Sequence, residues 1–252
     1  MNKHIYAVAA AVLVLSSSDA AEEQSGSLTM MNHETLELFD SARNRAVPVV
    51  IYSDLAAQGA KLKPAIISHG YGGKNTDYRF LAEHLAKRGY YVASIQHDVP
   101  GDEPLPKTGK PYEVRMPSWK RGVENILFVL AEVRKSQPEL RFDQLLVVGH
   151  SQGGDMSMLL TRDHPELVHA VISLDNRRMP FPRTKQPRIL SIRSSDQPAD
   201  EGVIPSPEEQ AQLGITIVKL PATKHDDMWD RATDAQKGEI LRHIDAFLGL
   251  GD

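Results

Sequence analysis

The chain has 252 residues, of which 41% are hydrophobic and 25% are charged, and its formal net charge is -4 at pH 7. This composition is typical of a globular protein rather than a disordered, collagen-like or coiled-coil chain, and the weak net charge does not indicate a nucleic-acid or membrane-surface partner. Cysteine is absent, which excludes a disulfide scaffold, a thiolate metal site and a cysteine nucleophile.

Residues 1–20 have the layout of a secretory signal peptide. Lys3 precedes an apolar run from Ile5 to Leu15, and small residues follow up to Ala20. The run is shorter than the roughly 20 residues that a membrane-spanning helix needs. We therefore expect cleavage after Ala20, export to a periplasm or to the outside of a cell, no stable membrane anchor after processing, and one domain over residues 21–252.

The predicted elements begin with a β-hairpin and continue as alternating strands and helices. Two β-rich runs, Leu36 to Phe39 and Val47 to Tyr52, flank a polar turn. Further strands are predicted at 65–70, 91–95, 145–149, 170–174, 188–193 and 215–220, and helices at 78–87, 119–135, after Ser151 and at the C-terminus. This alternation predicts an α/β fold with a mostly parallel, doubly wound sheet and helices on both faces. Residues 100–117, rich in Pro and Gly, form the longest segment predicted to be irregular.

A Gly-x-Ser-x-Gly motif stands between a predicted strand and a predicted helix. It comprises Gly149 to Gly153, with Ser151 at its centre. In this setting the motif is typical of a nucleophile elbow, a strained turn that exposes a serine hydroxyl at the sheet edge. Glycines are needed there because the backbone segments approach closely. We therefore predict that Ser151 is a nucleophile.

A glycine-rich loop, His69 to Gly73, follows an earlier strand that should end at the same edge of the sheet. The backbone N–H of Tyr71 and that of Gln152, the residue after the nucleophile, are the predicted donors of an oxyanion hole. The alternative is a glycine-rich turn that binds nothing.

A general base and an acid follow downstream. His225 is the histidine that follows the last predicted strand, where a loop can reach the elbow, and an imidazole suits a base near neutral pH. Asp196, after the strand at 188–193, is the predicted acid, with Asp200 and Asp175 as alternatives. His150 and His69 are expected to hold the backbone in place. The histidines show no metal-ligand spacing, so neither a metal nor a cofactor is predicted.

Together, the motif at Gly149 to Gly153, the loop at His69 to Gly73, Asp196 and His225 resemble the α/β-hydrolase superfamily, and the opening hairpin is similar to its dienelactone-hydrolase-like and acetylhydrolase-like esterases. The resemblance covers the chain from about Thr35 to the C-terminus. It implies the α/β-hydrolase fold, a serine nucleophile, an acyl-enzyme and the hydrolysis of a small-molecule carboxylic ester.

Several points about the substrate stay open from the sequence. Only a short connection, Asn176 to Pro187, occupies the usual position of a cap, so no large lid is predicted. Trp229, Met228 and Tyr71 either form an apolar substrate pocket or serve only in packing. The basic residues of the same region favour either an anionic substrate or a solvated loop: Arg177, Arg178, Arg183, Lys185 and Arg188. Peptidase or acyltransferase activity, or a non-catalytic binding role, are the alternative functions.

Overall fold

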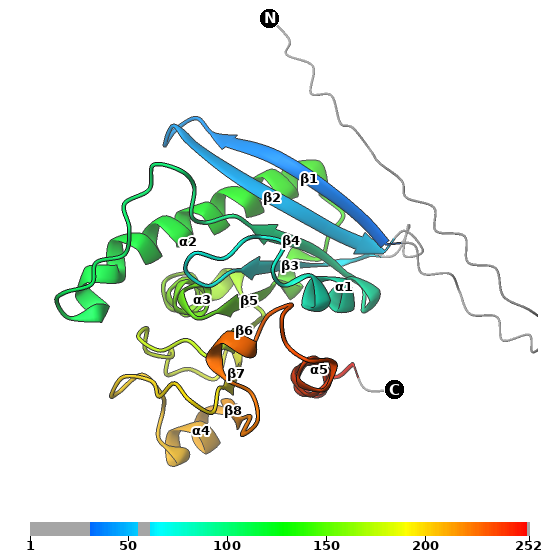
Figure 1. Ribbon diagram of the computed structural model, residues 1–252. Coiled ribbons are helices and arrows are strands. Elements are labelled where there is room, and N and C mark those ends of the chain that lie inside the picture. Colours follow the sequence, from blue (N-terminus) through cyan, green and yellow to red (C-terminus); the bar gives the residue numbers. More distant parts are fainter. Residues whose placement is uncertain (1–30, 55–60, 251–252) are drawn as a thin grey trace, which may run out of the picture.

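The computed structural model describes residues 31–54 and 61–250, and the predicted signal peptide lies outside the described residues. The described chain builds one eight-stranded sheet in the order β1-β2-β4-β3-β5-β6-β7-β8 (Figure 1). The strands are β1 (Met31–Asp40), β2 (Arg45–Asp54), β3 (Lys63–Ser68), β4 (Tyr90–Ile95), β5 (Leu146–His150), β6 (Ala170–Leu174), β7 (Arg188–Arg193) and β8 (Thr216–Lys219).

The predicted hairpin forms one edge of the sheet. Strands β1 and β2 pair antiparallel over their whole length and are longer than the apolar runs alone indicated. At the turn, one carboxylate oxygen of Asp40 accepts hydrogen bonds from the backbone N–H groups of Ala42 and Arg43, and Asn44 takes a positive φ. Strand β2 then pairs antiparallel with β4, which joins the hairpin to the parallel part of the sheet.

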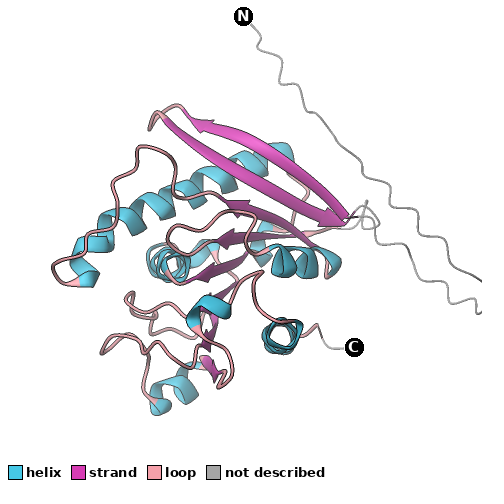
Figure 2. Ribbon diagram, viewed as in Figure 1, coloured by secondary structure: helices cyan, strands magenta, loops and turns pink. Residues whose placement is uncertain are grey.

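The remaining strand pairs, from β4-β3 to β7-β8, are parallel. Helices cover both faces, as Figure 2 shows. Side chains of α2 (Pro111–Ser136) and α3 (Gln152–Asp163) contribute to one apolar layer, and those of α1 (Arg79–Lys87) and α5 (Asp234–Leu248) contribute to the other. The predicted doubly wound, mostly parallel α/β architecture is confirmed.

Helix α2 starts eight residues before the predicted helix at 119–135 and takes up part of the segment predicted to be irregular. The part of this segment that α2 takes up contains two prolines, and proline is unfavourable inside a helix. Pro111 occupies the first turn, where its missing N–H costs nothing, but Pro117 lies inside the helix and forfeits one backbone hydrogen bond. The fully buried Trp119 anchors this part of the helix in the core.

A further short helix, α4 (Pro207–Leu213), was not predicted; it carries a capping box between Ser206 and Glu209. The connection between β6 and β7 contains neither helix nor strand, in agreement with the predicted lack of a large lid. Within residues 31–54 and 61–250, no helix combines the length and the apolar character needed to cross a membrane.

Candidate active site

Ser151 lies at the tight turn between β5 and α3. Its φ of 52° and ψ of -115° are unusual for a residue other than glycine. The turn is held by a 2.8 Å hydrogen bond from the backbone N–H of Ser151 to the carbonyl of Leu174, at the end of the neighbouring strand β6. The local conformation is therefore that of a nucleophile elbow, as the motif predicted.

The glycines of the motif are required by close backbone contacts. A Cβ at Gly149 would lie 2.1 Å from the carbonyl oxygen of Gly153, and a Cβ at Gly153 would lie 2.2 Å from the carbonyl oxygen of Ser68. Neither distance is compatible with a side chain. The elbow is thus packed directly against the end of β3, from which the glycine-rich loop continues.

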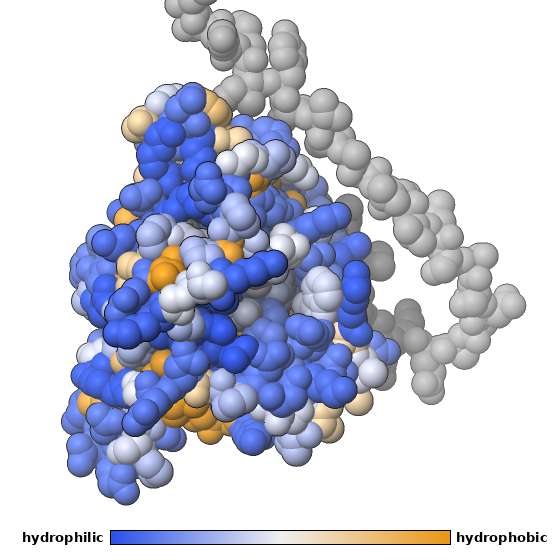
Figure 3. Space-filling model, turned by 60° about the vertical axis from the view of Figure 1, so that its left-hand side comes forward, coloured by the Kyte–Doolittle hydropathy of each residue, from blue (hydrophilic) through white to orange (hydrophobic). Residues whose placement is uncertain are grey.

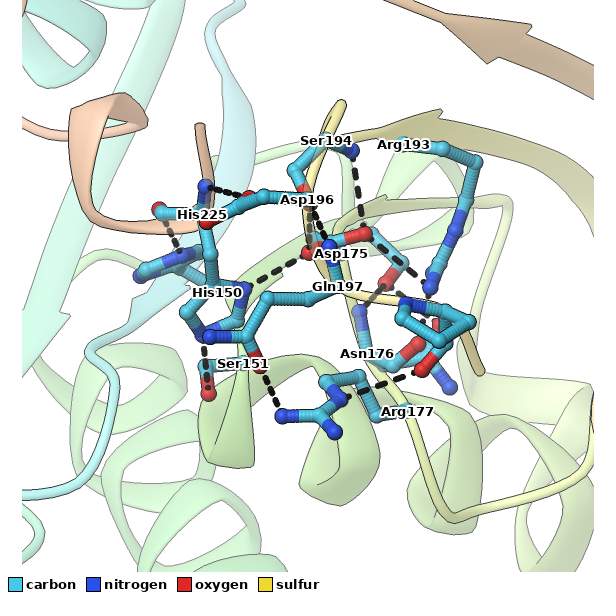
Figure 4. Close-up of polar contacts among 12 residues, drawn as sticks. His150, Ser151, Asp175, Asn176, Arg177, Arg193, Ser194, Asp196, Gln197 and His225 are labelled. Carbon is cyan, nitrogen blue, oxygen red and sulfur yellow. Dashed lines mark hydrogen bonds and ion pairs between the residues drawn. The ribbon is translucent and has the colours of Figure 1, made fainter. Parts of the chain in front are cut away.

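The structure brings Ser151, His225 and Asp175 together in a line (Figure 4). Nε2 of His225 is 2.9 Å from Oγ of Ser151, and Nδ1 of His225 is 2.6 Å from Oδ2 of Asp175. A carboxylate only accepts hydrogen bonds, so it fixes the proton on Nδ1 and leaves Nε2 free to accept the serine proton. The arrangement can remove a proton from the serine hydroxyl.

The carboxylate on the imidazole is that of Asp175, not that of Asp196, and this corrects the acid predicted from the sequence. Asp196 accepts a 2.8 Å hydrogen bond from the backbone N–H of His225 instead. Asp200, the other alternative, is exposed, and its backbone N–H donates to the carbonyl of Arg177. The physical reason lies in the strand order, because β6 is adjacent to β5 whereas β7 is one strand further away.

Asp175 is fully buried and has several donors besides His225. The hydroxyl of Ser194 donates to Oδ2 at 2.7 Å, the backbone N–H of Ser194 donates to Oδ1 at 3.1 Å, and Arg193 lies 3.0 Å from Oδ1. Burial by itself would raise the pKa of Asp175, but the hydrogen bond from His225, the charge of Arg193 and the bonds from Ser194 outweigh it and lower the pKa. Asp175 is therefore held as a carboxylate.

Of the two residues predicted to supply the oxyanion donors, one lines the same cleft as the serine and the other follows it in the chain. Tyr71 lines a small cleft of about 160 Å³ together with Ser151 and His225. Gln152 directly follows Ser151 as the first residue of α3, where a backbone N–H has no acceptor within the helix. The neighbouring N–H of Gly70 is already used, since it donates to the hydroxyl of Tyr78 at 3.2 Å.

A buried chain of hydrogen bonds joins the loops of the site. The hydroxyl of Tyr78, which accepts from Gly70, lies 2.6 Å from Nδ1 of His150, and Nε2 of His150 lies 3.1 Å from the carbonyl oxygen of His225. Burial, followed by the proximity of His225, lowers the pKa of His150 to about 3, so its ring is neutral. His150 therefore accepts from Tyr78 and donates to the His225 carbonyl, which ties three loops together.

His69 also serves the backbone, as expected. Its Nδ1 donates to the carbonyl of Gly70 at 2.7 Å, and its Nε2 accepts from the backbone N–H of His97 at 2.9 Å. Sequence reasoning missed Tyr78, Arg193 and Ser194. The position of Arg193 and Ser194 at the end of β7 was a signal, because parallel strands end at one edge, but nothing in the sequence linked Tyr78 to His150.

Of the residues proposed for an apolar pocket, Tyr71 and Trp229 line the cleft, while Met228 is fully buried in the apolar layer that includes α1 and α5. Tyr71 is 53% exposed, so one wall of the cleft is open to solvent. Among the residues that the structure describes, no group of three or more His, Asp or Glu side chains could hold a metal ion.

Comparisons with known proteins agree with the observed fold. The family model described as serine aminopeptidase, S33, matches residues 62–174, a segment that includes the glycine-rich loop, Ser151 and the end of β6. A ferulic acid esterase from Streptomyces cinnamoneus is 21% identical, with a TM-score of 0.55, over 79% of this chain and 76% of that chain.

Two further solved structures are similar. Fungal esterases from Rhizomucor miehei give 16% identity and a TM-score of 0.66 over 87% of this chain and 82% of that chain. A dienelactone hydrolase-like promiscuous phosphotriesterase from metagenomic libraries gives 14% identity and a TM-score of 0.67 over 87% of this chain and 98% of that chain. At these identities the structural likeness establishes a shared fold.

Proposed function

Because the chain has the α/β-hydrolase fold, we propose that it is a serine hydrolase of carboxylic esters in which Ser151, His225 and Asp175 form the catalytic triad. The observation that carries this proposal is the line of two hydrogen bonds, 2.9 Å from Ser151 to His225 and 2.6 Å from His225 to Asp175, at a strained elbow. The esterases among the similar structures support it.

In the acylation step, Oγ of Ser151 attacks the ester carbonyl carbon while Nε2 of His225 takes the hydroxyl proton. Asp175 keeps the imidazole oriented and stabilises its positive charge. The tetrahedral intermediate then collapses, the bond to the alkoxy oxygen breaks, and His225 gives its proton to the leaving alcohol. The acyl group is now bound to Ser151 as an ester.

In the deacylation step, a water molecule takes the place of the alcohol. His225 removes a proton from this water as it attacks the acyl carbon. As the second tetrahedral intermediate collapses, the bond between the acyl carbon and Oγ of Ser151 breaks, and His225 gives the proton to Oγ. A carboxylic acid leaves. The backbone N–H groups of Tyr71 and Gln152 stabilise the oxyanion in both steps, and a donor of this kind lowers the activation barrier by about 3 kcal/mol.

The surroundings of the site favour small, soluble esters over lipid aggregates. The cleft is small, and the connection between β6 and β7 adds no helix that would cover it. The molecular face that carries the loops of the carboxyl edge is largely hydrophilic, with only small hydrophobic patches (Figure 3). A surface that binds lipid generally presents a larger contiguous apolar area.

The test combines covalent labelling with turnover. We expect a fluorophosphonate probe to label Ser151 and short p-nitrophenyl esters to be hydrolysed. In Ser151→Ala we expect the label to be absent and kcat to be lower by a factor of at least about 10⁴. Thr161→Ala, a buried hydroxyl in the same helix, is the matched control that keeps both signals. Full turnover by Ser151→Ala would reject the proposed mechanism.

The same triad also serves in peptidases and acyltransferases, which differ only in the leaving group or the second nucleophile. Aminoacyl p-nitroanilides and an added alcohol acceptor extend the assay to these activities. We expect p-nitrophenyl esters to give the largest kcat/KM. A larger value for an anilide would make the chain a peptidase with the same nucleophile.

We also propose that residues 1–20 direct export and are removed, which leaves residues 21–252 as the catalytic domain in a periplasm or outside the cell. The charged start, short apolar run and small residues before Ala21 support this. Expression of the full chain in a bacterial host, followed by mass spectrometry of the exported fraction, should give a mature N-terminus at Ala21. A full-length cytoplasmic product would contradict the proposal.

A further inference from the structure

The glycine-rich loop leaves the backbone N–H of Tyr71 without an acceptor. The N–H groups of its three neighbours in residues 70–73 all donate within the protein, to the hydroxyl of Tyr78, a carboxylate oxygen of Asp98 and the carbonyl oxygen of Gly70. In the part of the chain that the structure describes, the N–H of Tyr71 has no such partner. It is therefore the N–H group that this segment can offer to a molecule in the cleft.

The direction of this N–H group is set by the peptide bond that joins Gly70 to Tyr71. In a trans peptide, the C=O and N–H groups point to opposite sides. The carbonyl of Gly70 accepts hydrogen bonds from Nδ1 of His69 at 2.7 Å and from the backbone N–H of Gly73 at 3.0 Å. The N–H of Tyr71 therefore points away from these two donors.

Gly70 is the residue about which this peptide could turn, because glycine restricts its backbone torsions least. Its own N–H, on the preceding peptide bond, donates to the hydroxyl of Tyr78 at 3.2 Å. A Cβ at Gly70 would lie 3.4 Å from Cβ of Ser151 and 3.6 Å from the Tyr78 hydroxyl, so this glycine stands directly beside the nucleophile. With hydrogen bonds to both its N–H and its C=O, Gly70 loses that freedom.

The hydroxyl of Tyr78 uses its single proton on a second partner. It lies 2.6 Å from Nδ1 of His150, whose Nε2 is 3.1 Å from the carbonyl oxygen of His225. A carbonyl only accepts hydrogen bonds, so Nε2 of His150 carries the ring proton and Nδ1 accepts from Tyr78. Burial raises the pKa of Tyr78, which keeps the hydroxyl protonated.

The hydrogen-bond chain ends on the backbone of the proposed base. The carbonyl of His225 accepts from His150, and its N–H donates to Asp196 at 2.8 Å, so the peptide groups on both sides of the residue are held (Figure 4). One chain of hydrogen bonds thus runs from the loop of the predicted oxyanion donor to the loop of the base, and Tyr78 lies between the two.

Tyr78 is itself firmly placed. It is the N-cap residue of α1, is only 3% exposed, and packs in the apolar layer that includes α1 and α5. The N–H groups of Arg79 and Phe80 in the first turn donate to the carboxylate of Asp230, which lies in the segment after His225. A hydroxyl on such a support can fix the position of a glycine-rich loop.

We propose that Tyr78 is a positioning residue: its hydroxyl orients the segment from Gly70 to Tyr71 so that the N–H of Tyr71 faces the oxyanion, and through His150 it keeps this segment aligned with His225. This inference rests on the proposed esterase function. An oxyanion donor is effective when it is already oriented as the charge develops, and a displacement of about 1 Å can cost about a hundredfold in rate.

Tyr78→Phe tests the proposal, because it removes the hydroxyl and keeps the ring. We expect kcat for p-nitrophenyl esters to fall about ten- to a hundredfold while KM changes less than about threefold, since the donor acts on the transition state. Titration with the fluorophosphonate should still label Ser151 in every molecule, so the loss is not that of an unfolded fraction.

The matched control is Tyr52→Phe. Tyr52 is 2% exposed and belongs to the same apolar layer as Tyr78, but it does not line the cleft. We expect it to leave kcat unchanged. An equal loss in Tyr52→Phe, or an unchanged kcat in Tyr78→Phe, would overturn the proposal.

A trifluoromethyl ketone inhibitor reports on the oxyanion directly. Oγ of Ser151 adds to its carbonyl carbon, the hydroxyl proton passes to Nε2 of His225, and the carbonyl oxygen becomes an oxyanion. We expect the inhibition constant to rise in Tyr78→Phe by about the factor by which kcat/KM falls. An unchanged inhibition constant would overturn the assigned role, because the lower kcat would then come from elsewhere.

His150→Gln interrupts the same chain one step further on. If both residues act through one chain, the double variant with Tyr78→Phe should lose no more than about threefold in kcat beyond the larger single loss. Losses that multiply would show that the hydroxyl acts on Gly70 alone, and they would overturn the proposed link to His225.

A measurement without turnover separates this proposal from the proposed function. In relaxation-dispersion NMR we expect exchange on the microsecond-to-millisecond scale at the Tyr71 amide in Tyr78→Phe but not in wild type or Tyr52→Phe. If no ester is hydrolysed but this difference appears, the positioning of the loop stands and the esterase proposal fails. If esters are hydrolysed and the Tyr71 amide behaves alike in all three proteins, the positioning proposal fails alone.

Discussion

Two loops at the carboxyl edge of the sheet each present an aspartate to the same histidine, and the two contacts differ in kind. Asp175, after β6, meets the imidazole of His225, whereas Asp196, after β7, meets the backbone N–H of that residue. Asp175 is fully buried and is surrounded by donors from Arg193 and Ser194, while Asp196 is exposed. Asp175 therefore acts on the protonation of the imidazole, whereas Asp196 holds the backbone of the loop that carries His225.

This difference shows that proximity to a histidine does not by itself define an acid's role. The role depends on which atoms the carboxylate reaches and on how far water is excluded from the contact. The pKa of Asp196 is lowered by the hydrogen bond from the backbone N–H of His225, and that of Asp175 by contacts that include the imidazole itself.

Of the substitutions at and around these two acids, Asp175→Asn should have the largest effect. The amide can donate to Nδ1 and thereby favour the tautomer in which Nε2 carries the proton, so the ring can no longer accept the proton of Ser151. We expect kcat for p-nitrophenyl esters to fall about 10⁴-fold, as measured in steady-state assays. Retention of more than a tenth of wild-type kcat would show that Asp175 is not the triad acid.

Ser194→Ala tests the polar shell around Asp175. The change removes the hydroxyl donor to Oδ2 and leaves the backbone N–H, Arg193 and His225 in place. Loss of one buried, charge-assisted hydrogen bond should lower kcat/KM about tenfold. Because Ser191→Ala removes a buried hydroxyl that has no hydrogen-bond partner, it is the matched control and should leave kcat/KM unchanged.

Asp196→Asn tests the second acid. The exposed carboxylate contributes a solvent-screened contact to the backbone of His225, and an amide oxygen can still accept the same hydrogen bond. We expect kcat/KM to change less than about threefold. A loss comparable to that of Asp175→Asn would reverse the roles that the two contacts indicate.

The pH dependence of thermal stability tests whether the buried Asp175 is held as a carboxylate. The folded pKa of Asp175 is lowered, so its stabilising contribution is fully present above the unfolded value of about 4 and is lost as the pH falls through the lower folded value. The Tm difference between wild type and Asp175→Asn, measured by scanning calorimetry, should therefore be largest near neutral pH and narrow in acid. A difference that stays constant from about pH 7 to pH 3 would contradict this.

Much of the fold could be predicted from the chain, because strands buried on both faces leave continuous apolar runs. The run at 170–174 became β6 and that at 188–193 became β7 with the predicted bounds. The start of α2 could not be predicted in the same way, since Pro111 and Pro117 resemble helix breakers and the burial of Trp119 is a tertiary contact.

The site shows the same division between local and tertiary information. Ser151 and the surrounding glycines were predictable because the strained turn leaves no space for side chains at positions that are close to the serine in the sequence. The choice among Asp175, Asp196 and Asp200 was not, because all three follow strands at the same edge and only the packed loops determine which oxygen faces the imidazole. Tyr78 and His150, 72 residues apart, carry no local sign of their contact.

The contact at Gly153 has a consequence for how the sequence can change over evolution. There α3 meets the carbonyl of Ser68 with no side chain between the two backbones. Substitutions in the apolar layers shift helices by altering the side chains that separate them from the sheet, but here there is no such spacer to alter. The spacing between the nucleophile and the glycine-rich loop can therefore stay fixed while the side chains of both apolar layers are substituted. Distant members of such a lineage can then share few residues and still align their reacting atoms.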